Sequence, residues 1–176
     1  MIEKSRFVRV LVWAFFASQA MGFLLAWSPL LPQVVGMSVH LAPKGMAFDE
    51  ARHLLSAQRW GGAALGLVAL VTLSAGLWHL DRLLRGLSAQ LIFSLANIAH
   101  LRAFAAATAG STVLSMLEVP TRGLMFRHLL DVKDARIKFE VSSNDLFLVL
   151  VCVVFYLIID LMHAARRIAQ ENEGFV

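Results

Sequence analysis

Cysteine and recognisable catalytic motifs are nearly absent from this sequence. Cys152 is the only cysteine among 176 residues, so an intramolecular disulfide and a cysteine metal cluster are excluded. The histidines do not follow a metal-binding spacing such as H-E-x-x-H, and we find no nucleophile motif, carboxylate pair or phosphate loop. We therefore expect a non-enzymatic protein without a catalytic residue, a cofactor or a metal ion.

Charged residues are also few, whereas apolar residues are abundant. The hydrophobic fraction is 59% and the mean hydropathy is +0.70, against roughly 45 to 50% apolar residues in an ordinary soluble domain. The net charge is +4, but the basic residues lie at the ends of apolar runs rather than in one patch. This distribution favours lipid headgroups as partners and does not indicate direct nucleic acid binding.

The apolar runs predict an all-α integral membrane protein that forms one four-helix domain. We expect transmembrane helices over residues 7–31, 60–80, 95–118 and 144–165. The first run is longer than the apolar region of a signal peptide, so we expect it to be retained. In the second, Gly62 and Gly66 have the small-xxx-small spacing that allows close helix packing, although this signal is weak.

For the third and fourth helices, individual residues predict how each helix packs, begins or ends. The third helix is rich in small residues, which predicts packing against other helices, and we expect Glu118 and Pro120 to end it. Glu118 and Arg122, one turn apart, are expected to form an ion pair. Ser142 or Ser143 can cap the fourth helix, with Asp145 in its first turn.

The segment before the fourth helix and the topology can also be predicted. Residues 136–141 alternate polar and apolar side chains, which indicates a small extramembrane strand or hairpin. Four spans place both termini on one side of the membrane. The lysines and arginines near the helix ends on that side favour the cytoplasm, so we expect both termini to be cytoplasmic.

Two segments resemble the DUF2975 family of bacterial membrane proteins of unknown function. The first is similar to a family segment through Phe93, Ser94, Asn97, Ile98, Leu101 and Arg102. The second is the tail, with Ser143, Asp145 and Leu146 opening the last helix and A-Q-E-N-E over residues 169–173. The glycine that usually precedes the first segment has no counterpart here. The resemblance implies a four-helix inner-membrane protein and no established activity.

Polar residues at the helix ends on the cytoplasmic side form the candidate site. Asp160 and His163 share a helix face because they are three residues apart, and Arg167 follows on nearly the same face. We expect the other members of this cluster to be His79, Asp81, Arg82, His100 and Arg102. The cluster either locks the helix ends together, which we favour, or forms a proton or metal site. The histidine spacing gives no metal motif.

These observations leave two main hypotheses for function. The first is a non-enzymatic inner-membrane protein that acts through a partner, such as a membrane protein or a second copy, as a sensor or regulatory subunit. The second is a small oligomeric transporter or ion pathway that uses Asp160 and His163. A third, weaker reading is a lipid-modifying enzyme in which His79, His100 and His163 converge on a metal ion.

Overall fold

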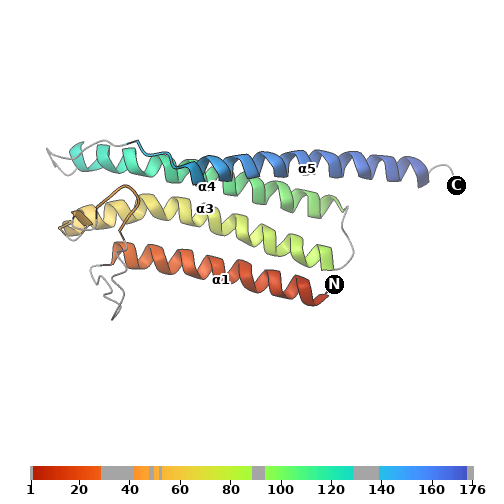
Figure 1. Ribbon diagram of the computed structural model, residues 1–176, viewed down its shortest axis with the longest axis horizontal. Coiled ribbons are helices and arrows are strands. Elements are labelled where there is room, and N and C mark those ends of the chain that lie inside the picture. The colour runs from red at the N-terminus through yellow and green to blue at the C-terminus, as the bar shows by residue number, and fades with distance from the viewer. Residues whose placement is uncertain are drawn as a thin grey trace.

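The computed structural model of the protein describes residues 2–28, 42–47, 50–51, 53–88, 94–128 and 139–173. Four long helices make up most of this part: α1 (Ile2–Trp27), α3 (Ser56–Ser88), α4 (Leu95–His128) and α5 (Ser143–Glu173). Successive helices run in opposite directions, and both termini lie at the same end of the molecule (Figure 1). We call this the termini end.

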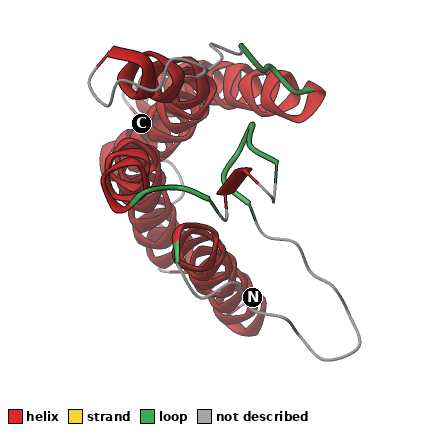
Figure 2. Cartoon of the chain, turned by 90° about the vertical axis from the view of Figure 1, so that its left-hand side faces the viewer, coloured by secondary structure: helices red, strands yellow, loops and turns green. Residues whose placement is uncertain are grey.

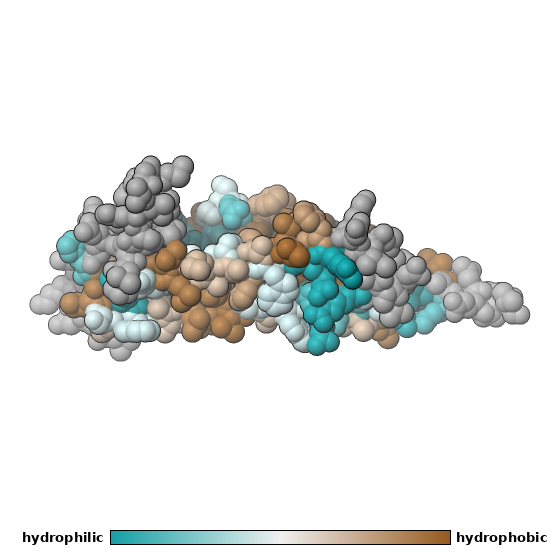
Figure 3. Space-filling model, turned by 90° about the horizontal axis from the view of Figure 1, so that it is seen from below, coloured by the Kyte–Doolittle hydropathy of each residue, from teal (hydrophilic) through white to brown (hydrophobic). Residues whose placement is uncertain are grey.

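Three of the four helices have the length and composition of membrane spans. The segments are Arg6–Trp27, Ser56–Gly86 and Ser143–Ile168, one fewer than the four spans predicted. Large apolar side chains such as Phe15, Val71 and Leu150 are exposed along them. Apolar atoms dominate the middle of the face in Figure 3, with polar atoms beside the start of α1. Because lipid solvates such a surface better than water, the protein is a membrane protein.

The helices form one curved layer rather than a closed bundle. The backbone of α1 lies against α3, that of α3 against α4, and that of α4 against α5, and no other pair of these helices comes close. The view along the helices shows an arc with α1 at one edge (Figure 2). The hollow side of this arc is occupied in part by residues 42–47. The layer therefore has two open edges and a concave face.

Small residues hold α4 in the middle of the layer, as the sequence predicted. Ala105 is fully buried, and Ser111 donates a hydrogen bond of 2.9 Å to the carbonyl oxygen of Ala69 on α3. A Cβ atom added to Gly76 on α3 would lie 3.1 Å from the side chain of Ala107. Short side chains let the two backbones approach closely, which strengthens van der Waals packing between helices in lipid.

Larger apolar side chains form the core toward the termini end. The cluster joins α3, α4 and α5 through the buried residues Leu83, Ile98, Leu101 and Ile159. Leu80, Phe104, Phe155 and Met162 pack around them. The core thus fixes the register of α3, α4 and α5 along their axes.

The start of α5 is capped as predicted, but the strand before it is not confirmed. The backbone N–H of Asp145 donates to the Ser142 hydroxyl, and that of Ser142 donates to the Asp145 carboxylate, both at 3.1 Å. This reciprocal pair is a capping box. Residues 136–138 of the predicted strand lie outside the described residues, and residues 139–141 form a loop rather than a strand.

Pro120 does not end α4, so that prediction was wrong. The helix continues to His128 with Pro120 inside it. An internal proline costs a helix about 3 kcal/mol or more because one backbone hydrogen bond is lost. Tertiary contacts on both sides of Pro120 offset this cost: Val119 and Arg122 are buried against residues 44–45, and Met125 lies against Gly61 of α3.

Gly62 and Gly66 mediate the contact between α3 and α1. A Cβ atom at Gly62 would overlap the ring of Trp27, and one at Gly66 would lie 2.9 Å from the ring of Phe23. Both aromatic rings come from α1, where they are four residues apart and so share a face. The small-xxx-small spacing of Gly62 and Gly66 thus identifies the place where two aromatic rings of α1 pack on the α3 backbone.

Replacing Gly62 by alanine should destabilise the protein. The added methyl group overlaps the Trp27 ring, and overpacking of this kind costs about 1 to 3 kcal/mol. Gly22→Ala is the matched control, because a Cβ atom there meets nothing within 4 Å. Thermal unfolding in one detergent should give a lower midpoint for Gly62→Ala and an unchanged or higher midpoint for Gly22→Ala. Equal midpoints for the two variants would contradict this packing.

Candidate functional site

The polar groups at the termini end divide into three sets, of which the first is centred on Asp81. The side chain of Asp81 is only 1% exposed. One carboxylate oxygen accepts a 2.6 Å hydrogen bond from Arg9 of α1, and the other accepts bonds of 2.6 and 2.9 Å from Arg85 of α3. Two cations thus compensate one buried carboxylate, and the group ties α1 to α3.

His79 and His100 form the second set, with Trp78 beside them. The two Nδ1 atoms lie 3.0 Å apart, which joins α3 to α4. A hydrogen bond between them requires one Nδ1 to carry a proton and the other to accept it. The Trp78 and His79 rings pack edge to face with centroids 4.8 Å apart, and the Arg82 guanidinium lies 4.9 Å from the Trp78 ring. This set can share a proton between two helices.

The third set, on α5, stays separate from the other two. Asp160, His163 and Arg167 are exposed, as is Arg102 on α4. Ile159, the residue before Asp160, is buried in the core, so Asp160 projects away from that core. In the described part of the chain, neither Asp160 nor His163 has an ion pair or a hydrogen-bonding side chain partner.

The structure therefore brings some residues of the predicted polar cluster into contact and leaves the others apart. His79 and His100 meet, but no group of three histidine, cysteine or acidic side chains that could hold a metal ion occurs within the described ranges. Asp81 pairs with Arg9 and Arg85, neither of which the predicted cluster included. The signal was available: Arg9 is a charged residue inside the first helix and needs a partner there.

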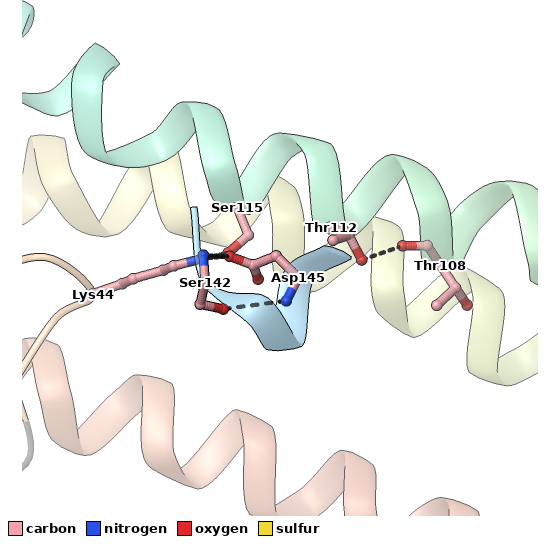
Figure 4. Close-up of polar contacts among 6 residues, drawn as sticks. All are labelled: Lys44, Thr108, Thr112, Ser115, Ser142 and Asp145. Carbon is pink, nitrogen blue, oxygen red and sulfur yellow. Dashed lines mark hydrogen bonds and ion pairs between the residues drawn. The ribbon is translucent and has the colours of Figure 1, made fainter. Parts of the chain in front are cut away.

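A second polar network, which sequence reasoning missed, lies at the opposite end and is centred on Lys44. The Lys44 ammonium donates 2.9 Å and 3.2 Å hydrogen bonds to Asp145 of α5 and Ser115 of α4 (Figure 4). Asp145 also caps α5 through Ser142. One lysine from a loop thus connects two helices and fixes the start of α5.

Lys44 reaches this position because it lies at the tip of a tight turn. The Met46 N–H donates to the Pro43 carbonyl oxygen at 3.1 Å, and Gly45 has a φ of +71°. Such a positive φ favours glycine, and a Cβ atom at Gly45 would lie 2.8 Å from Val119 of α4. The Pro-Lys-Gly sequence was the available signal for this turn, since proline and glycine mark turns.

Arg122 of α4 binds the backbone of the same turn. The Glu118 carboxylate accepts a 2.9 Å hydrogen bond from Arg122, which confirms the predicted ion pair. Arg122 is only 3% exposed, donates to the Lys44 carbonyl oxygen, and lies 5.7 Å from the Trp27 ring. Burial lowers the pKa of Arg122 and Glu118 opposes this effect, so the guanidinium remains charged near neutral pH.

A cavity of about 290 Å³ lies beside this network, on the concave side of the layer. Its walls come from α1, α3 and α4, and residues 42–44 border it. Lys44 and Glu118 both line it, together with apolar side chains such as Phe23 and Leu70. The end opposite the termini therefore combines a cavity with two groups of opposite charge.

No known protein family, curated protein or solved structure matches this chain.

Replacing Asp81 by asparagine should lower stability, because it leaves Arg9 and Arg85 without their carboxylate. We expect a loss of roughly 1 to 3 kcal/mol, less than the roughly 3 to 5 of a fully buried pair, since both arginines reach solvent. Asp160→Asn is the control that removes the same charge from an exposed position. Unfolding in detergent should distinguish the two, and an Asp160→Asn loss as large as that of Asp81→Asn would refute the assignment.

Proposed function

We propose that this protein is a non-enzymatic, four-span protein of the bacterial inner membrane that acts through partners, as a sensor or regulatory subunit. The observation that carries the proposal is the open layer, in which α1 and α5 form two separate edges. A closed bundle would satisfy its own packing surfaces, whereas an open layer leaves helix faces for another helix. Membership of the DUF2975 family remains a prediction that rests on the two short sequence segments.

The arrangement of α4 supports its role as the fourth span. It lies between α3 and α5, both of which have the composition of spans, and contacts both. Its charged residues Arg102 and Glu118 are sixteen residues apart, about 24 Å along a helix, against a hydrocarbon thickness of about 30 Å. The polar composition of α4 is compatible with a span because its small polar residues face neighbouring helices. Both termini then lie on one side, which we assign to the cytoplasm.

The exposed face of α5 provides a surface for a partner helix. Leu146, Leu150, Val153 and Leu157 follow one another at spacings of three and four residues and are each more than half exposed. Such a spacing forms a stripe along a helix that can pack against a second helix. Other large apolar side chains of α5, such as Phe147 and Leu161, are exposed as well, so the helix offers a broad apolar surface for a partner helix.

The polar end of α5 supports contact with a partner outside the membrane. The helix extends past the ends of α1 and α3 at the termini end (Figure 1). Asp160 and His163 are exposed beside the core residues Ile159 and Met162, and Arg167 follows one turn later with an exposed side chain. Charged groups on a protruding helix offer a surface for recognition, which gives these residues a role consistent with the proposal.

The same contacts weigh against an ion pathway through Asp160 and His163. Asp160 follows Ile159, which packs with Leu83 and Ile98 near helix ends, so the carboxylate lies near the termini end and not in mid-membrane. Midway along α3 and α4, Ser74 and Thr112 each donate to a backbone carbonyl one turn earlier, and Ser111 donates to the α3 backbone. The buried Thr108 hydroxyl has no hydrogen-bond partner among the described residues. A continuous path of polar groups across the layer therefore has no support in the described residues.

Photocrosslinking along α5 tests the proposal in native membranes. A photoreactive phenylalanine analogue at Leu150 or Leu157 should give adducts larger than the chain, because these side chains project from the layer. Ile159 is the control position, since its side chain is fully buried within the chain itself. Absence of adducts at both exposed positions, with a lone monomer after purification in mild detergent, would contradict the proposal.

A further inference from the structure

The cavity at the end opposite the termini has nearly the volume of a small-ligand site. Its volume of about 290 Å³ is close to the lower end of the roughly 300 to 1,000 Å³ of small-molecule pockets. Phe23 and Trp27 of α1 and Leu70 and Leu73 of α3 form an apolar wall. Gly22 also lines the cavity, and a Cβ atom there would project into open space. The walls can therefore accommodate an apolar group.

Glu118 provides the cavity with a negative charge. Its side chain is only 12% exposed, and the oxygen that binds Arg122 is the one nearest Gly66 of α3. A Cβ atom at Gly66 would lie 3.3 Å from that oxygen, so the glycine makes room for the carboxylate. The second carboxylate oxygen has no hydrogen-bond donor among the described residues. A carboxylate oxygen is thus available to a donor from a ligand.

Lys44 provides a positive charge to the same cavity. An ammonium group has three N–H donors, and the bonds to Ser115 and Asp145 use two of them. The third donor remains for a ligand. Ser115, which accepts from the ammonium, and Glu118 are three residues apart on α4, so they lie on one face with Cβ atoms about 5 to 6 Å apart.

We propose that this cavity binds a zwitterionic amphiphile, a molecule with an ammonium group and an anionic oxygen group a few bonds apart and an apolar body. Glu118 accepts hydrogen bonds from the ammonium group, and Lys44 binds the anionic group. The apolar body lies along Phe23, Trp27 and Leu70. Because each protein charge already has one partner outside the cavity, a ligand with both charges completes the site without leaving a net charge buried.

Two sources share this chemistry: a membrane lipid with an ethanolamine headgroup and a small zwitterion free in solution. Glu118 lies about 24 Å along α4 from Arg102, which is a suitable depth for a headgroup at the second membrane surface. Neither source depends on the partner interaction proposed above. A failure of one proposal therefore does not affect the other.

Native mass spectrometry of the full chain in mild detergent tests the site. The wild type should retain phosphatidylethanolamine at least about tenfold more strongly than phosphatidylglycerol, which lacks the ammonium group. Glu118→Gln should abolish this preference, and Asp160→Asn, which removes an exposed carboxylate elsewhere, should preserve it. Equal retention of the two lipids by the wild type would overturn the proposal.

A second pair of variants tests the cavity itself without altering the charged groups. Gly22→Leu fills the cavity, whereas Gly22→Ala adds only one methyl group in open space. Gly22→Leu should lower retention of phosphatidylethanolamine at least about tenfold, with thermal stability equal to or above that of wild type. Gly22→Ala should retain it. Undiminished binding by a folded Gly22→Leu variant would place the lipid elsewhere and overturn the proposal.

Phosphoethanolamine without acyl chains identifies the source of the ligand. It can be added alone to the wild type and to Gly22→Leu in the same experiment. Binding to the wild type and not to Gly22→Leu assigns the site to a small soluble zwitterion. If phosphatidylethanolamine binds and phosphoethanolamine does not, the ligand is a membrane lipid. Either of these two results supports the proposed site for a zwitterion. Equal binding of phosphoethanolamine to both proteins would argue against the cavity as its location.

Discussion

Close packing between α3 and α4 is the interaction on which the rest of the structure depends. Hydrophobic exclusion from water cannot hold two helices together in lipid, so short contacts between backbones must do so. Ala105, Gly76 and the Ser111 hydrogen bond to Ala69 provide these contacts. The other two helices then pack on either side of this pair, α1 against α3 and α5 against α4, and neither contacts a second helix among the described residues.

Polar groups near the two ends of the layer fix the heights of the helices relative to one another. At the termini end, Asp81 ties α1 to α3 and the histidine pair ties α3 to α4. At the other end, Lys44 connects α4 and α5, and Arg122 holds the turn that carries Lys44. Directional bonds of this kind specify register in a way that apolar contacts among similar side chains do not. Because these bonds lie near the two ends, the middle of the layer can be mainly apolar.

The concave shape gives the protein two different kinds of surface. The edge helices α1 and α5 expose many large apolar side chains, and these suit another helix or lipid chains. The concave side contains the cavity lined by Lys44 and Glu118. Asp145 compensates the charge of Lys44, and Arg122 compensates that of Glu118. Both the association surface and the ligand site that we propose follow from the same fact, that four helices are arranged in an arc.

Several features could be predicted from local sequence because their causes are local. The apolar runs, the capping box at Ser142 and Asp145, and the Glu118–Arg122 pair each involve residues within a few positions of one another. Pro120 misled the prediction because its local cost is offset by contacts from residues 44–45 and from α3, which a local pattern does not contain.

The sequence by itself determined that the chain is helical, apolar on its outside and polar near the ends of its spans, since these follow from composition and period. Only the tertiary structure decided which charges meet. Arg9 and Asp81 are 72 residues apart, and Lys44 and Asp145 are 101 apart. Pairing over such distances depends on helix order, tilt and height in the layer. Those depend in turn on which small residues allow two backbones to approach, and this is a property of the whole assembly of helices.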